Sequence, residues 1–120
     1  MRLLRIMATL CLAIMLAVPV FALDYRGAKC SGEQTSDQKI YGANCLLTGV
    51  LIITDGTNSA KVVVKDSTTA TGTVVAEFTV AGSSYFGGGT WEVPVEMHSG
   101  IYCDVTGTGA SYVVYFIPLP

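Results

Sequence analysis

After residue 22 the chain alternates apolar and polar side chains with the period of a half-buried β-strand. No segment there repeats apolar residues at helical spacing for more than one turn. In the clearest example, residues 73–80, the side chains predicted to face inward are Val74, Ala76, Phe78 and Val80. The predicted strands cover residues 23–29, 40–41, 45–54, 60–65, 73–80, 90–96, 101–106 and 111–117. The pattern therefore predicts an all-β fold, a single antiparallel β-sandwich of about seven strands that is jelly-roll-like.

Segments rich in glycine and asparagine separate the predicted strands. Asp55-Gly56-Thr57-Asn58 predicts a hairpin between residues 45–54 and 60–65, because Gly and Asn accept the positive φ angles of hairpin turns. Gly107-Thr108-Gly109 predicts a second tight turn. Gly87-Gly88-Gly89 is too flexible for an ordinary strand interior, so it predicts a bend, a bulge or a close approach of another segment.

Three predicted strands also indicate where they lie in their sheets. Residues 45–54 are almost continuously apolar, which predicts a strand covered on both faces. Pro94 predicts that residues 90–96 form an edge strand, because proline cannot donate to a neighbouring strand. The side chains of this strand that are predicted to face inward are Trp91, Val93 and Val95. Residues 111–117 are apolar and aromatic, so we expect this strand to be central or to be buried against another subunit.

Residues 1–22 predict a signal peptide. Two arginines precede an apolar run of about 16 residues that ends at Phe21, and Ala22 is the small residue that signal cleavage requires. A permanent anchor is the alternative, but a spanning helix needs roughly 20 apolar residues, and Pro19 interrupts this run near its end. We therefore expect an N-terminal signal helix, export to the periplasm or the medium, and a mature domain of residues 23–120 that does not bind membranes.

Charge narrows the range of partners. The chain is 51% apolar and 13% charged, a composition that excludes a disordered polyelectrolyte. Loss of residues 1–22 removes two arginines and leaves five basic against nine acidic side chains. Binding to the phosphates of nucleic acid needs clustered Lys and Arg, so we expect no nucleic-acid partner.

Three cysteines follow the signal peptide, and an exported chain is expected to pair two of them. Cys30 and Cys45 enclose a polar loop whose closure contributes about 3 kcal/mol in the loop-entropy estimate. This pair is the predicted disulfide, and Cys103, which alternates with apolar residues, is then a small buried side chain. A Cys45–Cys103 disulfide with Cys30 free remains the alternative.

A search for reactive groups finds no catalytic, cofactor or metal site. His98, the single histidine, lies beside Ser99 and Gly100 in a predicted turn, without a nucleophile motif. The cysteine spacing does not suit zinc. The oxygens of residues 55–58 and Asp66 do not follow the EF-hand order that binds calcium. A glycosidase pair among Glu77, Glu92 and Glu96 would have to flank a cleft, which a convex sheet face does not offer. The expectation is a protein that is not an enzyme.

The aromatic residues offer one candidate contact surface. Trp91 belongs to the core by its place in the alternation, whereas Tyr102 and Tyr115 are predicted to point outward. These two tyrosines are therefore the predicted residues of a contact with another subunit or with a glycan.

The order of turns and strands from Leu46 to Phe116 resembles a family of small proteins encoded by tailed bacteriophages. The residues that carry the resemblance are Gly49-Val50-Leu51-Ile52-Ile53-Thr54-Asp55-Gly56-Thr57-Asn58, Lys65-Asp66, Thr71-Gly72-Thr73, Gly100-Ile101-Tyr102 and Gly107-Thr108-Gly109-Ala110-Ser111-Tyr112-Val113-Val114-Tyr115. The resemblance implies an oligomeric, virion-associated β-sandwich of the decoration, head-fibre or tail-accessory kind. The signal peptide and the cysteines depart from that pattern.

Two functions follow as expectations. The first is an exported structural or interaction module without enzymatic activity, virion-associated or on the cell surface, that forms a homo-oligomer. The alternative is a secreted carbohydrate-binding or adhesin-like domain.

Overall fold

The computed structural model describes residues 27–120, and within them the side chains of Trp91 and Glu92 are not described. The predicted signal peptide, most of the predicted strand at residues 23–29 and the inward orientation of Trp91 lie outside this part. The described residues form strands and turns without a helix. The strands are β1 (Lys29–Cys30), β2 (Gln38–Tyr41), β3 (Cys45–Ile53), β4 (Ala60–Asp66), β5 (Thr73–Val80), β6 (Phe86–Met97), β7 (Ile101–Thr106) and β8 (Ser111–Pro118).

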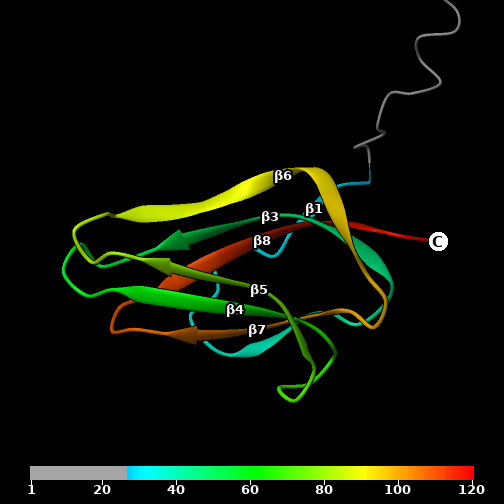
Figure 1. Ribbon diagram of the computed structural model, residues 1–120, viewed down its shortest axis with the longest axis horizontal. Helices are drawn as coiled ribbons and strands as arrows, with labels where there is room; N and C mark the ends of the chain where they lie inside the picture. Colours follow the sequence, from blue (N-terminus) through cyan, green and yellow to red (C-terminus); the bar gives the residue numbers. More distant parts are fainter. Residues whose placement is uncertain (1–26) are drawn as a thin grey trace, which may run out of the picture.

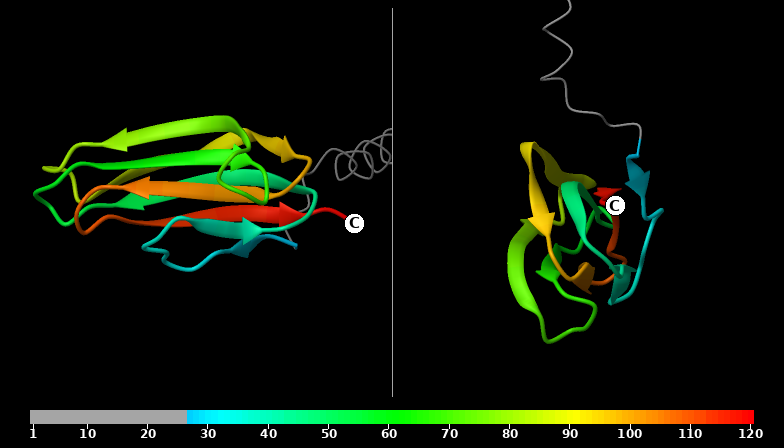
Figure 2. Two further views of the ribbon diagram at one scale, coloured as in Figure 1. Left: turned by 90° about the horizontal axis from the view of Figure 1, so that it is seen from below. Right: turned by 90° about the vertical axis from the view of Figure 1, so that its right-hand side faces the viewer.

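These strands form two four-stranded antiparallel sheets. Sheet A has the order β1-β8-β3-β6, and sheet B has the order β2-β7-β4-β5. Figure 1 shows β6, β3 and β8 above β5, β4 and β7, and the end-on view in Figure 2 shows the two layers around a common interior. The predicted all-β, two-sheet architecture is confirmed. The prediction that the last strand is central is also confirmed, because β8 lies between β1 and β3.

The strand pairings are nested. The first strand pairs with the last, β2 with β7, β3 with β6, and β4 with β5, while β3 with β8 and β4 with β7 complete the sheets. Within the described residues, β4 and β5 are therefore the only consecutive strands that share a sheet. Every other connection passes from one layer to the other.

This topology corrects one prediction, the hairpin at Asp55-Gly56-Thr57-Asn58. The segment does turn the chain: an Asp55 carboxylate oxygen accepts hydrogen bonds from the backbone N–H groups of Thr57 and Asn58, at 2.9 and 2.7 Å. However, β3 belongs to sheet A and β4 to sheet B, so the two strands do not pair with each other. Turn residues specify a reversal of direction, whereas the choice of pairing partner depends on strands distant in the sequence.

The core lies between the sheets and follows the predicted alternation over most of its length. In β4, Val62 and Val64 are fully buried, and in β7 Cys103 is fully buried, as its place in the alternation predicts. The buried side chains that pack together as the core cluster are Cys45, Leu47, Val50, Ile52, Ala60, Val62, Val64, Val80, Met97, Ile101, Cys103, Ala110, Tyr112, Val114 and Phe116.

Two bulges reverse the alternation, so the inward orientations predicted for Val74 and Val93 are wrong. Val64 pairs with Ala76 and Lys65 pairs with Val74, which leaves Val75 as an extra residue and turns Val74 outward, with 53% exposed. In β6, residues 91–94 lie opposite the single residue Thr48 of β3, which makes the second bulge. Val93 within it is 80% exposed. The prediction that β6 is an edge strand is confirmed.

The predicted Cys30–Cys45 disulfide does not form in this structure, where Cys30, Cys45 and Cys103 are all free thiols. Cys30 lies opposite Tyr115 on one side of β8, and Cys45 lies opposite Pro118 on the other side. Two strand spacings and three residues along the strand place the two Cα atoms about 14 Å apart, beyond the ~7 Å that a disulfide spans.

The course of the polar loop after Cys30 explains why the predicted disulfide is absent. After Cys30 the chain continues along β8, with the N–H of Ser31 bonded to the carbonyl of Val114 and the N–H of Gln34 bonded to that of Tyr112. The loop thereby leads away from the end of β8 at which Cys45 lies. The alternative pair, Cys45 with Cys103, is also unformed.

Candidate interaction surface

The outer face of sheet B carries two ion pairs. Lys61 of β4 and Glu77 of β5 form an ion pair at 2.7 Å. Lys65 of β4 forms an ion pair with Asp104 of β7 and also donates to the carbonyl of Ala70. A charged face of this kind is typical of the solvent-exposed side of an antiparallel sheet.

The outer face of sheet A is different, because three successive rows across β8, β3 and β6 contain no charged side chain. Cross-strand partners lie on the same face of a sheet, so the register defines these rows. The rows are Ser111–Ile53–Phe86, Val113–Leu51–Gly88 and Tyr115–Gly49–Thr90. Two carboxylates border these rows: Glu96 lies in the next row, Ile117–Leu46–Glu96, and Glu33 accepts a hydrogen bond from the Ser111 hydroxyl at 2.6 Å. We call the three uncharged rows, together with Tyr85, the apolar face.

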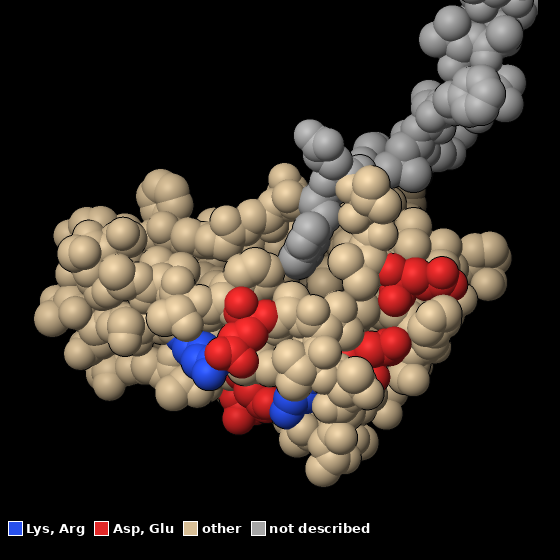
Figure 3. All heavy atoms as spheres, viewed as in Figure 1, with Lys and Arg blue, Asp and Glu red and all other residues tan. Residues whose placement is uncertain are grey.

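The surface view agrees with this difference between the sheets. In Figure 3 the acidic and basic atoms gather over the lower and right-hand parts of the coloured surface. The upper left, where β6 begins, has none in the coloured part of this view. In this view the surface around the start of β6 is thus free of charged side chains.

A groove of about 440 Å³ crosses the apolar face. Its lining residues are Val50, Leu51, Phe86, Gly87, Gly88, Gly89, Thr90 and Tyr115. The glycines have no side chains, so the groove reaches down to the backbone of β6 between the rings of Phe86 and Tyr115. A second hollow of about 460 Å³, lined by Leu51, Ile53, Thr54, Tyr85 and Phe86, lies on the other side of Phe86. Phe86 therefore borders both hollows.

The glycine triplet is a place of close approach, one of the three alternatives that the sequence left open. Gly88 has φ of +110°, and a Cβ atom there would lie 2.2 Å from the carbonyl oxygen of Val50. A Cβ at Gly87 would lie 2.7 Å from a methyl carbon of Val80. The depth of the groove is thus a requirement of the backbone packing at this edge.

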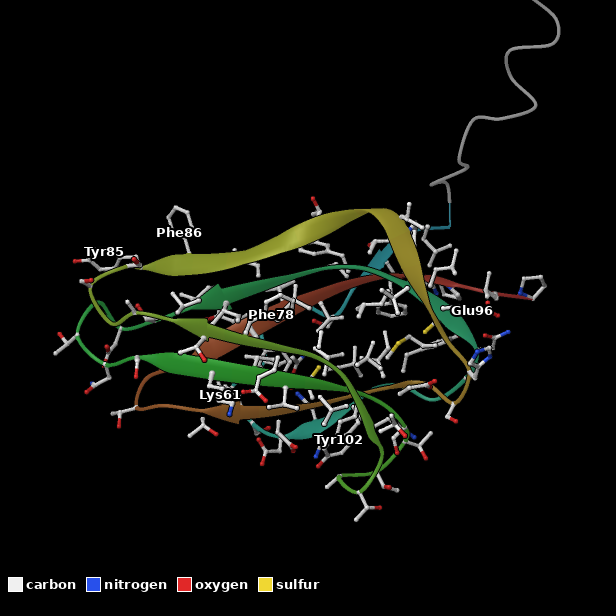
Figure 4. The ribbon with its side chains drawn as sticks, viewed as in Figure 1. Lys61, Phe78, Tyr85, Phe86, Glu96 and Tyr102 are labelled. Carbon is white, nitrogen blue, oxygen red and sulfur yellow. The ribbon has the colours of Figure 1, made fainter. Side chains whose placement is uncertain are left out.

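The aromatic corner beside the groove is held by the backbone. The N–H of Thr54 donates to the carbonyl of Tyr85 at 2.9 Å, and the Thr54 hydroxyl donates to the carbonyl of Ser84. The rings of Tyr85 and Phe86 nevertheless stay in solvent, 68% and 71% exposed, and Figure 4 shows both pointing away from the sandwich. The corner therefore presents two large rings on a fixed backbone.

The two tyrosines predicted as a contact surface point outward but do not share a surface. Tyr115 of β8 borders the groove on sheet A. Tyr102 of β7 pairs with Lys39 and Lys65 on the outer face of sheet B. Of the predicted pair, only Tyr115 belongs to the apolar face.

Phe86 was not singled out as a contact residue by the sequence, although one signal was available. Tyr85 and Phe86 are adjacent, and two consecutive side chains of a strand cannot both face the core. What the sequence does not contain is the register that places Phe86, Ile53 and Ser111 in one row.

The residues considered for chemistry serve as structural groups. The imidazole Nδ1 of His98 lies 3.8 Å from Glu96, and both side chains are mostly exposed. The oxygens of Asp55 accept hydrogen bonds from Thr57 and Asn58. Within residues 27–120 no group of three His, Cys, Asp or Glu side chains is arranged to bind a metal ion.

Asp66 holds the turn that follows β6. Its carboxylate accepts hydrogen bonds from the backbone N–H groups of Ser99, at 2.8 Å, and His98, at 3.1 Å. Burial alone would raise the pKa of Asp66, but the backbone donors of Ser99, His98 and Gly100 outweigh burial and lower this pKa. A lowered pKa in the folded state means that the carboxylate stabilises the fold above its unfolded pKa of about 3.9, and that this contribution is lost as the pH falls.

We therefore expect Asp66→Asn to lower the free energy of unfolding by about 1–2 kcal/mol at pH 7 and by less at pH 3. Urea denaturation at the two pH values measures the difference. The matched control is Glu77→Gln, which removes an exposed ion pair and should cost no more than about 1 kcal/mol. An equal loss for both variants, or a larger Asp66→Asn effect at pH 3, would contradict this role.

No helix within residues 27–120 has the length and apolar character needed to cross a membrane. Comparison with known proteins finds no matching family model, no matching curated protein and no matching solved structure.

Proposed function

We propose that this chain is an exported structural module with a jelly-roll fold, which acts through surface contact and not through catalysis. The nested pairing of the strands supports the fold. A jelly roll is a long antiparallel ribbon wrapped into two four-stranded sheets. Such a ribbon pairs its outermost strands first and its central hairpin last, as β1 with β8 and β4 with β5 do here.

The observation that carries the proposed role is the difference between the two outer faces. Sheet B presents ion pairs to solvent. Sheet A presents a groove, two rings that are more than two-thirds exposed, and three rows without charge. The largest apolar patch that a monomeric protein exposes, typically a few hundred Å², is often a functional contact site. The apolar face is therefore the surface through which the module would act.

The resemblance to tailed-bacteriophage proteins supports a virion-associated role of the decoration, head-fibre or tail-accessory kind. Two of its segments, residues 49–58 and 107–115, meet in space, because a Cβ atom at Gly109 would lie 2.8 Å from the Cβ of Asp55. A further Cβ at Gly107 would lie 2.3 Å from the carbonyl oxygen of Ser59. The residues that carry the resemblance are thus ones that the fold itself needs. The resemblance therefore supports the fold more strongly than it supports the role.

The alternative is a secreted glycan-binding domain, and the observation in its favour is the exposed ring of Tyr115 beside the groove. Sugars are held by stacking on rings together with several polar groups. The side chains that line the groove include a single non-aromatic polar group, the hydroxyl of Thr90. Contact with an apolar protein surface therefore fits the groove better than a glycan does.

Density-gradient fractionation tests the proposed function. Particles released by cells that carry the gene are banded in caesium chloride, and the protein is identified by peptide and intact-mass spectrometry. The expected result is a form that begins at Leu23 and bands with particles of capsid density.

Two outcomes would overturn the proposal. One is a protein of residues 1–120 that stays in the cytoplasm and in no particle band. The other is retention on a polysaccharide column that Tyr115→Ala abolishes and Tyr102→Ala, the matched change on the opposite face, leaves intact.

A further inference from the structure

We propose that the apolar face binds the same face of a second copy of this chain, with each Phe86 ring inserted into the groove of the other copy. This inference rests on the proposed function, because it names the partner of the surface through which the module would act. The contact is isologous: one patch serves both partners, and a two-fold axis relates them.

The first argument is the amount of apolar surface that remains in solvent. Phe86 and Tyr85 are 71% and 68% exposed, and Tyr115 is 38% exposed. A complete aromatic side chain has a surface of about 200 Å², so the first two rings alone leave about 280 Å² open. Leu51 and Ile53, between these rings and β8, are only half-buried. A monomer gains nothing from this arrangement.

The second argument is shape. One face carries both a projecting ring, Phe86, and a groove beside it that is lined by Leu51, Gly88, Thr90 and Tyr115. A projection and a hollow that lie at different points of one surface can fill each other when a two-fold axis passes between them. A partner with a different surface would have to supply both features, whereas a second copy already has them.

The third argument is charge. The mature chain is acidic, with nine carboxylates against five basic side chains, so two copies repel each other at most orientations. The ion pairs of sheet B lie on the far side of the sandwich from the apolar face. Stacked sheets are about 10 Å apart, so these charges lie more than one Debye length, about 8 Å at physiological salt, from the contact plane. On sheet A, Glu33 lies beside Ser111 at the β8 edge of the face. Two acidic copies can therefore meet over the β3 and β6 part of the apolar face, where the rows contain no charge.

The area sets the expected strength. The three rows and Tyr85 span six residues of about 3.3 Å each across three strands about 4.8 Å apart, which gives a patch of roughly 14 by 20 Å, or about 280 Å² in projection. A standard interface buries about 800 Å² per partner. The contact therefore belongs to the weak class, and we expect a dimer that forms only at high micromolar protein concentration.

Sedimentation velocity of the exported protein, from about 1 to 500 µM, tests this proposal. The expected result is a reversible shift from monomer to dimer that persists at high salt. Phe86→Glu, at an exposed position, should raise the dissociation constant by about tenfold or more, because it would bury a charge that has no partner. Thr90→Glu, on the groove wall, should have the same effect from the other side of the contact. Circular dichroism verifies that both variants are folded.

The matched control is Val74→Glu, an equally drastic change at an exposed position of sheet B, which should leave dimerisation unchanged. A wild-type protein that stays monomeric at every concentration would overturn the inference, and so would equal weakening by Val74→Glu. Failure of the proposed function is seen separately, because the gradient experiment reports on particle association whether or not the free protein dimerises. A monomeric protein that needs Phe86 to bind particles would mean that a different protein covers this face.

Discussion

Replacement of Gly88 by alanine is expected to lower the free energy of unfolding by about 3 kcal/mol. The backbone of Gly88 has φ of +110°, a conformation that side chains rarely adopt. The added Cβ would also lie 2.2 Å from the carbonyl oxygen of Val50, so β6 would have to move away from β3. Urea denaturation of the variant and the wild type measures the loss.

Gly89→Ala is the control, because it adds the same atom to the neighbouring residue. A Cβ at Gly89 meets nothing within 4 Å, and loss of a glycine also reduces the entropy of the unfolded chain. Gly89→Ala should therefore be neutral or stabilise the protein by up to about 1 kcal/mol. Similar losses for both variants would mean that the triplet is needed for general flexibility and not for close approach at Gly88.

Alkaline pH should destabilise the protein through its buried thiols. Burial, reinforced by the charge of Asp104, raises the pKa of Cys103 to about 12. Burial, with a contribution from Asp66, raises the pKa of Cys45 to about 11. The folded state therefore keeps both protons at a pH where the unfolded state, with a thiol pKa near 9.0, has lost them. The contribution of these thiols to the free energy of unfolding is fully present below about pH 9. Above pH 9 the free energy of unfolding falls by about 1.4 kcal/mol per pH unit for each thiol.

Denaturation curves between pH 8 and pH 10 measure this slope, below the range in which Tyr112, whose pKa is also raised by burial, begins to contribute. Cys103→Ala should reduce the slope by about half, since one of the two thiols is removed. Cys30→Ala removes an exposed thiol and should leave the wild-type slope. If Cys103→Ala unfolded as steeply with pH as the wild type, lysine and tyrosine side chains would account for the alkaline loss.

The period of two in the sequence was sufficient to predict an all-β fold, because successive side chains of a strand point to opposite faces and the apolar ones face the core. Val62, Val64 and Cys103 lie where that rule places them. The rule fails at Val74 and Val93 because a bulge adds residues to one strand only, and an inserted residue leaves no mark in the polarity pattern.

Pairing was harder to predict than alternation. The hairpin expected at Asp55-Gly56-Thr57-Asn58 and the Cys30–Cys45 disulfide both assumed that segments close in sequence meet in space. In the nested arrangement β3 pairs instead with β6 and β8, and β1 pairs with β8. The candidate surface depends on the same long-range register. The alternation was therefore enough to predict that Tyr115 points outward, but not that Phe86 lies on the same face.

The central place of β8 also sets the time at which the protein can fold. Residues 111–118 follow all the other described strands in the chain, yet both β1 and β3 pair with them. Until the ribosome has released these residues, sheet A lacks its middle and the core lacks Tyr112, Val114 and Phe116. Folds dominated by such distant contacts also form slowly, in milliseconds to seconds. Sheet A therefore cannot be completed before β8 has been synthesised, and loss of residues 111–118 would remove the middle of the sheet and not merely one of its edges.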